Sequence, residues 1–425
     1  MEIASLLGVS RQSEETLLQM EQKAQPQFAQ IDAISHVNQA KVLHAFAANG
    51  IVAGHFQPST GYGYSDIGRD TLEALFATVF GAQQAIVRPH IVSGTHALAI
   101  ALQGLLSPGQ TLLYASGKPY DTLEQVIGLE PAHGSLMERG IRYEQIDLLA
   151  DGGIDLEALE AHLRANASIC VVALQRSAGY AWRRALRVEE LKAAADLVHA
   201  IRPQAFVFVD NCYGEFTQTQ EPTEVGVDVI AGSLIKNAGG GLAPTGGYIC
   251  GTQAALERIE SALNAPGIGR ACGSYEASYR PFFQGLFMAP TVVAAAVKTA
   301  VLFAHTFAAL GYAVNPAPQA MRSDIIQCIR FGEREKLLAF CRAIQQAAPV
   351  DSMAVPEPWA MPGYTHEVVM AAGAFVQGSS IELSADGPLC EPYTAYMQGG
   401  LTYAHGRIGC LYAIEAMQQG KPLCK

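Results

Sequence analysis

The sequence contains no extended cluster of lysine or arginine, no C-x-x-C pair and no histidine at metal-ligand spacing. Its formal net charge is -11, so we expect neither nucleic acid nor an anionic membrane surface as a partner. Nine cysteines lie scattered along the chain, which is typical of reduced thiols in a cytoplasmic protein. We therefore expect neither a disulfide framework nor a metal site.

The chain also lacks features of a secreted or membrane protein. Its N-terminus, MEIASLLGVSRQSEE, has no basic region followed by an apolar core, so we expect no signal peptide. The longest apolar stretch, residues 286–314, contains Pro290, Lys298 and His305, and it predicts a buried helix rather than a membrane span. No internal repeat or low-complexity tract occurs. These absences favour a soluble globular protein.

The length of 425 residues, half of them hydrophobic, predicts two domains. From Ala85 onward, short β-branched runs alternate with helical patterns, which is typical of parallel α/β construction. The seven predicted strands of one sheet are 85–92, 111–115, 141–147, 169–174, 205–210, 227–231 and 247–250. The helices predicted between them are near 95–106, 121–127, 155–164, 188–200 and 253–263.

Helical patterns flank this alternating region on both sides. We predict an N-terminal helix over 13–48, and a helix that begins with a capping box of Asp70 and Glu73 and ends at Gly81. A long helix over 285–310 precedes a smaller α+β domain. That domain has strand-like runs 325–330 and 368–376 and helices near 333–346 and 401–418. The predicted divisions are 1–50 for the arm, 51–285 for the large domain, and 286–425 for the linker helix and small domain.

A lysine among small residues stands out in VDVIAGSLIKNAGGGLAPTGGYICG. Lys236 follows an apolar run and precedes three glycines, which would allow a planar ligand to approach the backbone closely. It is either a solvated loop lysine or a partly desolvated amine whose neutral form can bind an aldehyde.

Two further features follow other predicted strands. Ser93, Gly94, Thr95 and His96 open an apolar helix directly after a strand, where free N–H groups and the helix dipole favour an anion. An ordinary N-cap is the alternative. Asp210 ends the strand AFVFVD, at the edge of a parallel sheet where ligands of such folds bind. It could instead hold the next loop.

Together these parts match the requirements of pyridoxal phosphate. The cofactor needs an anion site for its phosphate, a carboxylate for its ring nitrogen and a lysine for its aldehyde. Ser233, three residues before Lys236, can add a hydroxyl to the phosphate site. A nucleotide site in GGGLAPTGG matches neither phosphate-loop spacing. A non-enzymatic metal-stress protein would need clustered exposed carboxylates, which the sequence does not indicate.

Longer motifs resemble one known family. They are SGTHALAIAL, SGKPYDTLEQVIG, FVDNCYGEF, EPTEVGVDVIAGSLIKNAGGGLAPTGGYI, APGIG, FQGLFMAP and FVQGSSIELSADGP. The chain is similar over nearly its whole length to the aluminium-resistance or methionine gamma-lyase family, which is cystathionine beta-lyase-like. The resemblance implies a fold-type I pyridoxal-phosphate enzyme, with a mostly parallel seven-stranded sheet and a small C-terminal domain. It also implies a cytoplasmic homotetramer built of dimers.

The resemblance also assigns residues. It implies that Lys236 binds the cofactor aldehyde, that Asp210 pairs with the ring nitrogen, and that Tyr120 stacks on the ring or is only a buried tyrosine. Tyr62, Tyr64 and Arg69 resemble residues that reach the phosphate of a neighbouring subunit, although Arg69 could equally form an ion pair at a helix start. The family commonly has an arginine where this chain has Cys390, so Arg322 and Arg407 are the candidates for the substrate carboxylate.

The expected reaction is β- or γ-elimination on a sulfur amino acid such as methionine, cystathionine or a cysteine-like substrate. A thiol, a 2-keto acid and ammonia would be the products, with Lys236 or Tyr120 as acid or base. Aldol cleavage and transamination use the same cofactor groups and are the alternatives.

Overall fold

The computed structural model describes residues 3–360 and 366–419. Its larger sheet has the strand order β1-β7-β6-β5-β4-β2-β3. The strands are β1 Gln84–Arg88, β2 Thr111–Tyr114, β3 Arg142–Gln145, β4 Ile169–Gln175, β5 Phe206–Asp210, β6 Val229–Ser233 and β7 Gly247–Gly251. Only β7 runs against its neighbours in this sheet. The predicted mostly parallel, seven-stranded sheet is therefore confirmed.

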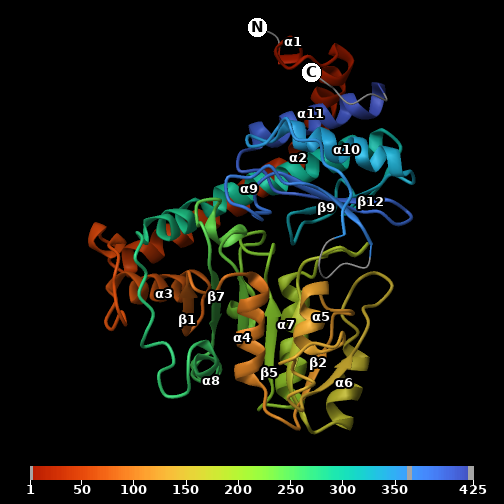
Figure 1. Cartoon of the computed structure of the whole chain (residues 1–425). Coiled ribbons are helices and arrows are strands. Elements are labelled where there is room, and N and C mark those ends of the chain that lie inside the picture. The colour runs from red at the N-terminus through yellow and green to blue at the C-terminus, as the bar shows by residue number, and fades with distance from the viewer. Residues whose placement is uncertain (1–2, 361–365, 420–425) are drawn as a thin grey trace.

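Helices cover both faces of this sheet (Figure 1). They are α3 Ile67–Val79, α4 Gly94–Leu105, α5 Asp121–Ile127, α6 Leu156–Ala165, α7 Val188–Ile201 and α8 Gln253–Leu263. Successive strand residues point to opposite faces. Val172 accordingly joins the core under α3, α6 and α7, whereas Val171 joins the core under α4, α5 and α8. Short 3-10 turns lie at Ala53–Phe56, Pro222–Val225 and Asn237–Gly239.

A second, antiparallel sheet lies above the first, in the order β10-β11-β12-β9-β8 (Figure 1). Its strands are β8 Ala313–Asn315, β9 Ile326–Arg330, β10 Val368–Ala371, β11 Ser384–Pro388 and β12 Thr394–Gln398. The helices of this part of the chain are α10 Arg334–Ala347 and α11 Tyr403–Gln419. The strand predicted over 368–376 ends at Ala371. Three strands were not predicted. β8 is only three residues long and β11 (SADGP) contains residues that disfavour strands, whereas β12 (TAYMQ) was missed although its Thr and Tyr favour strands.

Two long helices connect the two sheets. After the short α1 (Ile3–Leu7), α2 (Arg11–Ala48) lies beside α9 (Arg280–Ala309) over most of its length (Figure 1). Among the described residues, α9 alone is long and apolar enough to cross a membrane, but 78% of its most apolar window is buried within the structure. α9 is therefore the buried helix that the sequence predicted. The eight described cysteines are free, and Cys424 lies outside the described residues.

The start of α3 differs from the prediction. Asp66, not Asp70, is the N-cap, and its Oδ1 accepts a hydrogen bond from the N–H of Arg69 at 3.0 Å. Glu73 does not complete a capping box. Its buried Oε1 accepts from the N–H of Val87 at 3.1 Å and pairs with Arg88 at 3.2 Å. Aspartates occur at both positions 66 and 70 near the helix start, and only Asp66 is the N-cap, with an extended backbone. The predicted capping box of Asp70 and Glu73 was therefore wrong.

Backbone packing against α9 positions the turn that follows Lys236. A Cβ on Gly285 of α9 would lie 2.2 Å from the carbonyl oxygen of Gly239, and one on Gly240 would lie 2.2 Å from the carbonyl oxygen of Gly285. Gly240 also has a positive φ of 54°. Because both contacts are to backbone, neither can be relieved by a side-chain rotation.

We expect Gly285→Ala to lower the free energy of unfolding by about 1–3 kcal/mol, because the overpacking exceeds the roughly 1 kcal/mol that alanine gains in a helix. Chemical denaturation of the purified chain measures this. Gly54→Ala is the matched control, since the nearest atom to its Cβ is 4.0 Å away. Equal stabilities for the two variants would contradict the packing argument.

Candidate active site

Three predicted features meet at one edge of the larger sheet. β1, β5 and β6 run in the same direction, so their carboxyl ends lie together. Ser93 and Gly94 follow β1, Asp210 ends β5, and Lys236 follows β6. A Cβ on Gly94 would lie 3.4 Å from both the Cβ of Ser233 and the Sγ of Cys212, so the segment after β1 directly contacts the end of β6.

Lys236 projects over an aromatic ring. Its Nζ lies 4.1 Å from the ring centroid of Tyr213, which follows Asp210 by three residues. The Tyr213 hydroxyl is 2.9 Å from the Oγ of Ser380 in the loop before β11. The lysine is therefore held between the end of the larger sheet and the smaller sheet, as a cation against an aromatic face.

Opposing effects act on the pKa of Lys236. Burial alone would lower the pKa of its amine, but Cys212, Tyr213 and Asp210 act in the opposite direction and raise that pKa above its ordinary value. The two expected settings of Lys236, a solvated loop lysine and a partly desolvated amine, differ in burial, and the structure places the amine in a buried position beside Asp210, Cys212 and Tyr213.

Asp210 is buried at the end of β5. Its Oδ1 accepts a hydrogen bond from the N–H of Cys212 at 3.1 Å. Burial raises the pKa of the Asp210 carboxyl, whereas the charge of Lys236 opposes that rise. A second cation close to this carboxylate would further favour its ionised form.

The start of α4 offers hydrogen-bond donors. The Oγ of Ser93 caps the helix by accepting from the N–H of His96 at 3.1 Å, while the Nδ1 of His96 accepts from the N–H of Val92. The N–H groups of Gly94 and Thr95 bond to no described residue. The two predicted roles of this segment are therefore compatible. Ser93 is an N-cap, and the N–H groups of Gly94 and Thr95 remain as donors for an anion beside Ser233.

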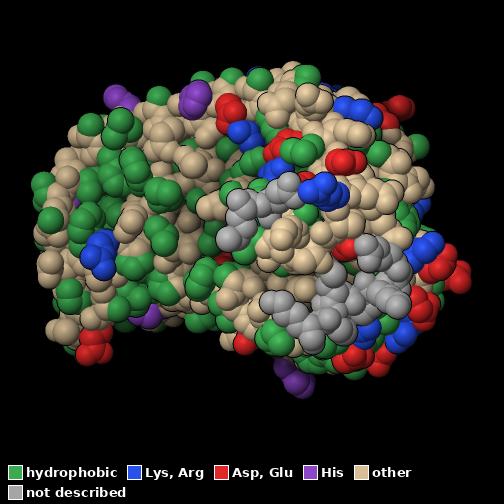
Figure 2. Space-filling view, turned by 90° about the horizontal axis from the view of Figure 1, so that it is seen from above, with side chains coloured by type: hydrophobic (Ala, Val, Ile, Leu, Met, Phe, Trp, Pro, Cys, Tyr) green, Lys and Arg blue, Asp and Glu red, His purple; other side chains and the backbone are tan. Residues whose placement is uncertain are grey.

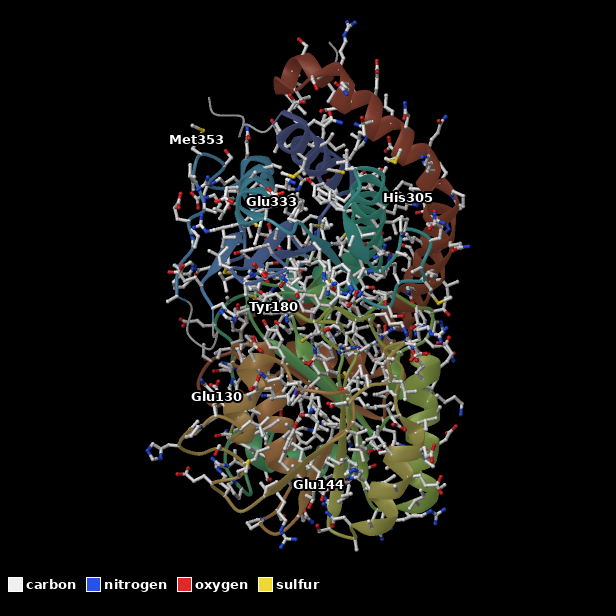
Figure 3. All side chains as sticks on the ribbon, turned by 90° about the vertical axis from the view of Figure 1, so that its right-hand side faces the viewer. Glu130, Glu144, Tyr180, His305, Glu333 and Met353 are labelled. Atoms are coloured by element: carbon white, nitrogen blue, oxygen red, sulfur yellow. The ribbon has the colours of Figure 1, made fainter. Side chains whose placement is uncertain are left out.

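A cavity of about 200 Å³ opens at Lys236. Its walls come from both sheets and include Tyr120, Tyr180, Tyr213, Ser379, Ser380, Asp386 and Gln398. Figure 3 shows Tyr180 at the level where the two parts of the molecule meet. The rings of Tyr120 and Tyr180 are 5.9 Å apart, so the aromatic residue proposed for the cofactor ring does line the same cavity as Lys236.

Asp386 is the carboxylate in the described wall of this cavity. Its Oδ2 accepts hydrogen bonds from the hydroxyl of Tyr180 at 2.7 Å and from Nε2 of Gln398 at 3.1 Å. Its Oδ1 is buried without a described partner. Burial raises the pKa of Asp386 to about 6.

Sequence reasoning missed Tyr213, Tyr180, Ser380 and Asp386 as site residues. Three of the four lie in segments that carried the family resemblance, FVDNCYGEF and FVQGSSIELSADGP. The motifs were therefore a usable signal. What the sequence did not reveal is that these segments converge, because that depends on how the smaller sheet packs against the larger one.

Other predicted site residues lie apart from Lys236 in the single chain. Tyr62 and Tyr64 are exposed and stack on each other, with ring centroids 5.5 Å apart. Arg69 is buried at the start of α3, where its Nε pairs with Asp70 at 2.9 Å and its Nη1 donates to the carbonyl of Gly63 at 2.8 Å. The structure thus places Arg69 in the helix-start ion pair that the sequence left open.

The two candidate arginines for the substrate are also not in the described wall of the Lys236 cavity. Arg407 of α11 donates from Nε to both carboxylate oxygens of Glu21 at 3.1 Å. Arg322 lines a different cavity, between α2 and α9.

The fold and the site together define a class of protein. YhfS of Escherichia coli, a pyridoxal-5'-phosphate dependent protein, shares the fold with a TM-score of 0.61 at 16% identity, over 91% of this chain and 97% of that one. The chain has the fold of the fold-type I pyridoxal-phosphate enzymes.

The chain belongs to the methionine gamma-lyase family, whose model matches residues 13–418. The uncharacterised protein YnbB of Bacillus subtilis is 48% identical over 392 residues, which are 92% of this chain and 93% of YnbB. A carbon-sulfur lyase involved in aluminium resistance from Clostridium novyi is 48% identical, with a TM-score of 0.94 over 97% of this chain and 98% of that one. The family indicated by the sequence motifs is confirmed.

The family implies pyridoxal phosphate, and the residues at this edge fit it. The N–H groups of Gly94 and Thr95 have no described partner, and Gly94 lies close to Ser233, whose Cβ would be 3.4 Å from a Cβ on Gly94. Asp210 and Lys236 supply the carboxylate and the amine from neighbouring strands. Among the described residues, no group of three or more His, Cys, Asp or Glu could hold a metal ion.

We expect Asp386→Asn to change how stability depends on pH. The folded state holds the proton of Asp386 more tightly than the unfolded chain, so this residue stabilises the fold below its unfolded pKa of 3.8 and loses that contribution as pH rises through about 6. The variant should therefore gain stability relative to wild type between pH 4 and pH 7, by up to about 3 kcal/mol. Denaturation at several pH values measures the difference, and a difference that is constant with pH would contradict the burial argument.

Proposed function

We propose that this protein is a pyridoxal-phosphate-dependent carbon-sulfur lyase that catalyses β- or γ-elimination on a sulfur amino acid. The observation that carries the proposal is the convergence of Lys236, Asp210 and the Gly94–Ser233 contact at one sheet edge. Family membership supports it, and so does the carbon-sulfur lyase name of the Clostridium novyi relative. The products are a thiol, a 2-keto acid and ammonia.

Each residue group has a distinct task in this proposal. When bound, pyridoxal phosphate supplies an electron sink for the charge left at the substrate Cα. The N–H groups of Gly94 and Thr95 and the hydroxyl of Ser233 hold its phosphate, and Asp210 keeps its ring nitrogen protonated. Tyr120 stacks on its ring.

Proton transfer is assigned to Lys236 and Tyr120. The Lys236 amine takes the proton from the substrate Cα and either group returns a proton to the leaving sulfur. Burial lowers the pKa of the Lys236 amine, whereas Cys212, Tyr213 and Asp210 raise it, and the amine acts as a base in its deprotonated form. A γ-elimination requires a second proton removal at Cβ, for which Lys236 is the base within the cavity.

The test is an absorption spectrum with and without borohydride. We expect a yellow band in the purified protein that borohydride fixes covalently to the chain, because Lys236 binds the cofactor aldehyde. Lys236→Ala should not be fixed and should lose at least about a thousandfold of any keto-acid release. Lys192→Ala, on the surface and paired with Asp196, is the control. A chain that stays colourless with added cofactor would refute the proposal, and keto acid without thiol would indicate transamination.

We propose further that the chain is a homotetramer of dimers and that the active site is shared across each dimer. On the face of the molecule that Figure 2 shows, hydrophobic side chains are more numerous over the left half. Exposed apolar residues include Leu43, Val52, Tyr62, Tyr64, Ile67 and Phe287. Exposed apolar surface of this kind favours association, and the exposed ring of Tyr62 is available to a neighbouring site.

Mixing two variants tests the shared site. We expect Tyr62→Ala and Lys236→Ala each to lose activity, whereas co-expressed subunits should recover about a quarter of wild-type activity, because half of the dimers are mixed and each has one intact site. Recovery no greater than the average of the two parents would show that Tyr62 serves its own subunit. The same co-expression with Tyr64→Ala in place of Tyr62→Ala identifies which of the two tyrosines serves the neighbouring site.

A further inference from the structure

The smaller sheet contributes one carboxylate to the wall of the cavity at Lys236. In the antiparallel pairing of this sheet, Asp386 of β11 lies directly opposite Met370 of β10 and Tyr396 of β12. Residues opposite each other in such a ladder point to the same face of the sheet. Met370, Asp386 and Gln398 all line the cavity that Lys236 lines. The acid therefore belongs to the proposed active site, although the proposed reaction gives it no task.

Asp386 acts on this cavity through its charge rather than through an exposed oxygen, because the residue is only 3% exposed. Its Oδ2 accepts hydrogen bonds from the hydroxyl of Tyr180 at 2.7 Å and from Nε2 of Gln398 at 3.1 Å. A tyrosine hydroxyl has one hydrogen to donate. A ligand carboxylate would therefore have to compete with Asp386 for the hydrogen of Tyr180.

The charge of Asp386 reaches the space next to Lys236. It contributes to the raised pKa of Tyr213, and the Nζ of Lys236 lies 4.1 Å from the centroid of the Tyr213 ring. Burial raises the pKa of Asp386 to about 6, so its carboxyl group is an anion at slightly alkaline pH. The field of an anion enclosed by protein is screened much less than that of an anion in water.

Lys236 is the only cation among the described residues that line the cavity. An amino-acid substrate brings one carboxylate of its own to this site. A second carboxylate, at the far end of the side chain, would meet the charge of Asp386 without a further cation to balance it, and like charges in such a setting disfavour binding. An uncharged side chain avoids this repulsion, and the thioether of Met370 beside Asp386 offers it an apolar, polarizable contact.

We propose that Asp386 is a specificity-determining residue, which selects sulfur amino acids with an uncharged side-chain end and rejects those with a second carboxylate. This inference rests on the proposed lyase function and narrows its substrate class to alkyl thioethers such as methionine. Asp386 makes the selection from the cavity wall, through its charge, and takes no part in proton transfer.

A matched pair of substrates tests this selection. S-carboxymethyl-L-cysteine and S-carbamoylmethyl-L-cysteine differ only in a terminal carboxylate or amide, and their homocysteine homologues serve for γ-elimination. At about pH 8, where Asp386 is ionised, we expect kcat/KM of the full-length, cofactor-loaded protein to favour the amide at least about tenfold. Asp386→Asn keeps the shape of the side chain without its charge, and it should reduce this preference at least about fivefold by improving conversion of the acid. Asp228→Asn, at the opposite end of β6 from Lys236, is the control and should keep the wild-type preference.

Binding of unreactive amino acids separates this inference from the lyase function. L-2-aminoadipate and its side-chain amide have no leaving group, so calorimetric titration measures their binding whether or not the protein releases a thiol. We expect the acid to bind at least about tenfold more weakly than the amide, and Asp386→Asn to reduce that difference. Asp386→Ser removes the same charge and should have the same effect, which covers the case in which Asp386→Asn folds poorly.

The outcomes distinguish the two proposals. If no substrate releases a keto acid but the acid binds more weakly than the amide, the lyase proposal fails and the selection by Asp386 is supported. The inference about Asp386 is overturned if wild type binds and converts the acid as well as the amide, if it binds and converts neither, or if the two uncharged variants keep the wild-type preference.

Discussion

The position of Lys236 depends on a contact between two backbones. The turn after Lys236 packs its Gly239–Gly240 peptides against Gly285 of α9, at a distance that leaves no room for a side chain. The same helix continues through both hydrophobic cores: Val293 and Val297 belong to the core of the larger sheet, and Phe303 and Phe307 to that of the smaller one. One rigid helix thus sets how the lysine faces the loop of Ser380 and the strand of Asp386.

Electrostatics at the site follow from this enclosure. Burial raises the pKa of Asp210, of Asp386 and of Glu215, which accepts from the hydroxyl of Tyr248 at 2.7 Å and has a pKa of about 8. Lys236 is the cation among these groups that lines the cavity. Perturbed pKa values that cluster in this way around one lysine are typical of functional sites.

The sequence predicted the larger sheet well because its strands obey strong local rules. Buried parallel strands are continuous β-branched runs, so they are easy to recognise. A residue that follows such a strand lies at the carboxyl edge of the sheet, and the sequence alone therefore placed Asp210, Lys236 and Ser93 together. The smaller sheet was harder. β11 reads SADGP, and the buried Oδ2 of its Asp386 is hydrogen-bonded by Tyr180 and Gln398, partners that no local pattern identifies.

The same distinction explains the arginines. A sequence indicates that an arginine is present but not which side chains surround it. Arg322 lines the cavity between α2 and α9, and Arg407 pairs with Glu21, so neither is in the described wall of the Lys236 cavity. The described wall of the Lys236 cavity instead presents hydroxyls and an amide, from Tyr120, Tyr180, Ser379, Ser380 and Gln398. Neutral donors bind a carboxylate less strongly than a guanidinium does. Within one chain, a carboxylate in this cavity would meet only such neutral donors and Lys236, and their geometry depends on α9, which packs in the cores of both sheets.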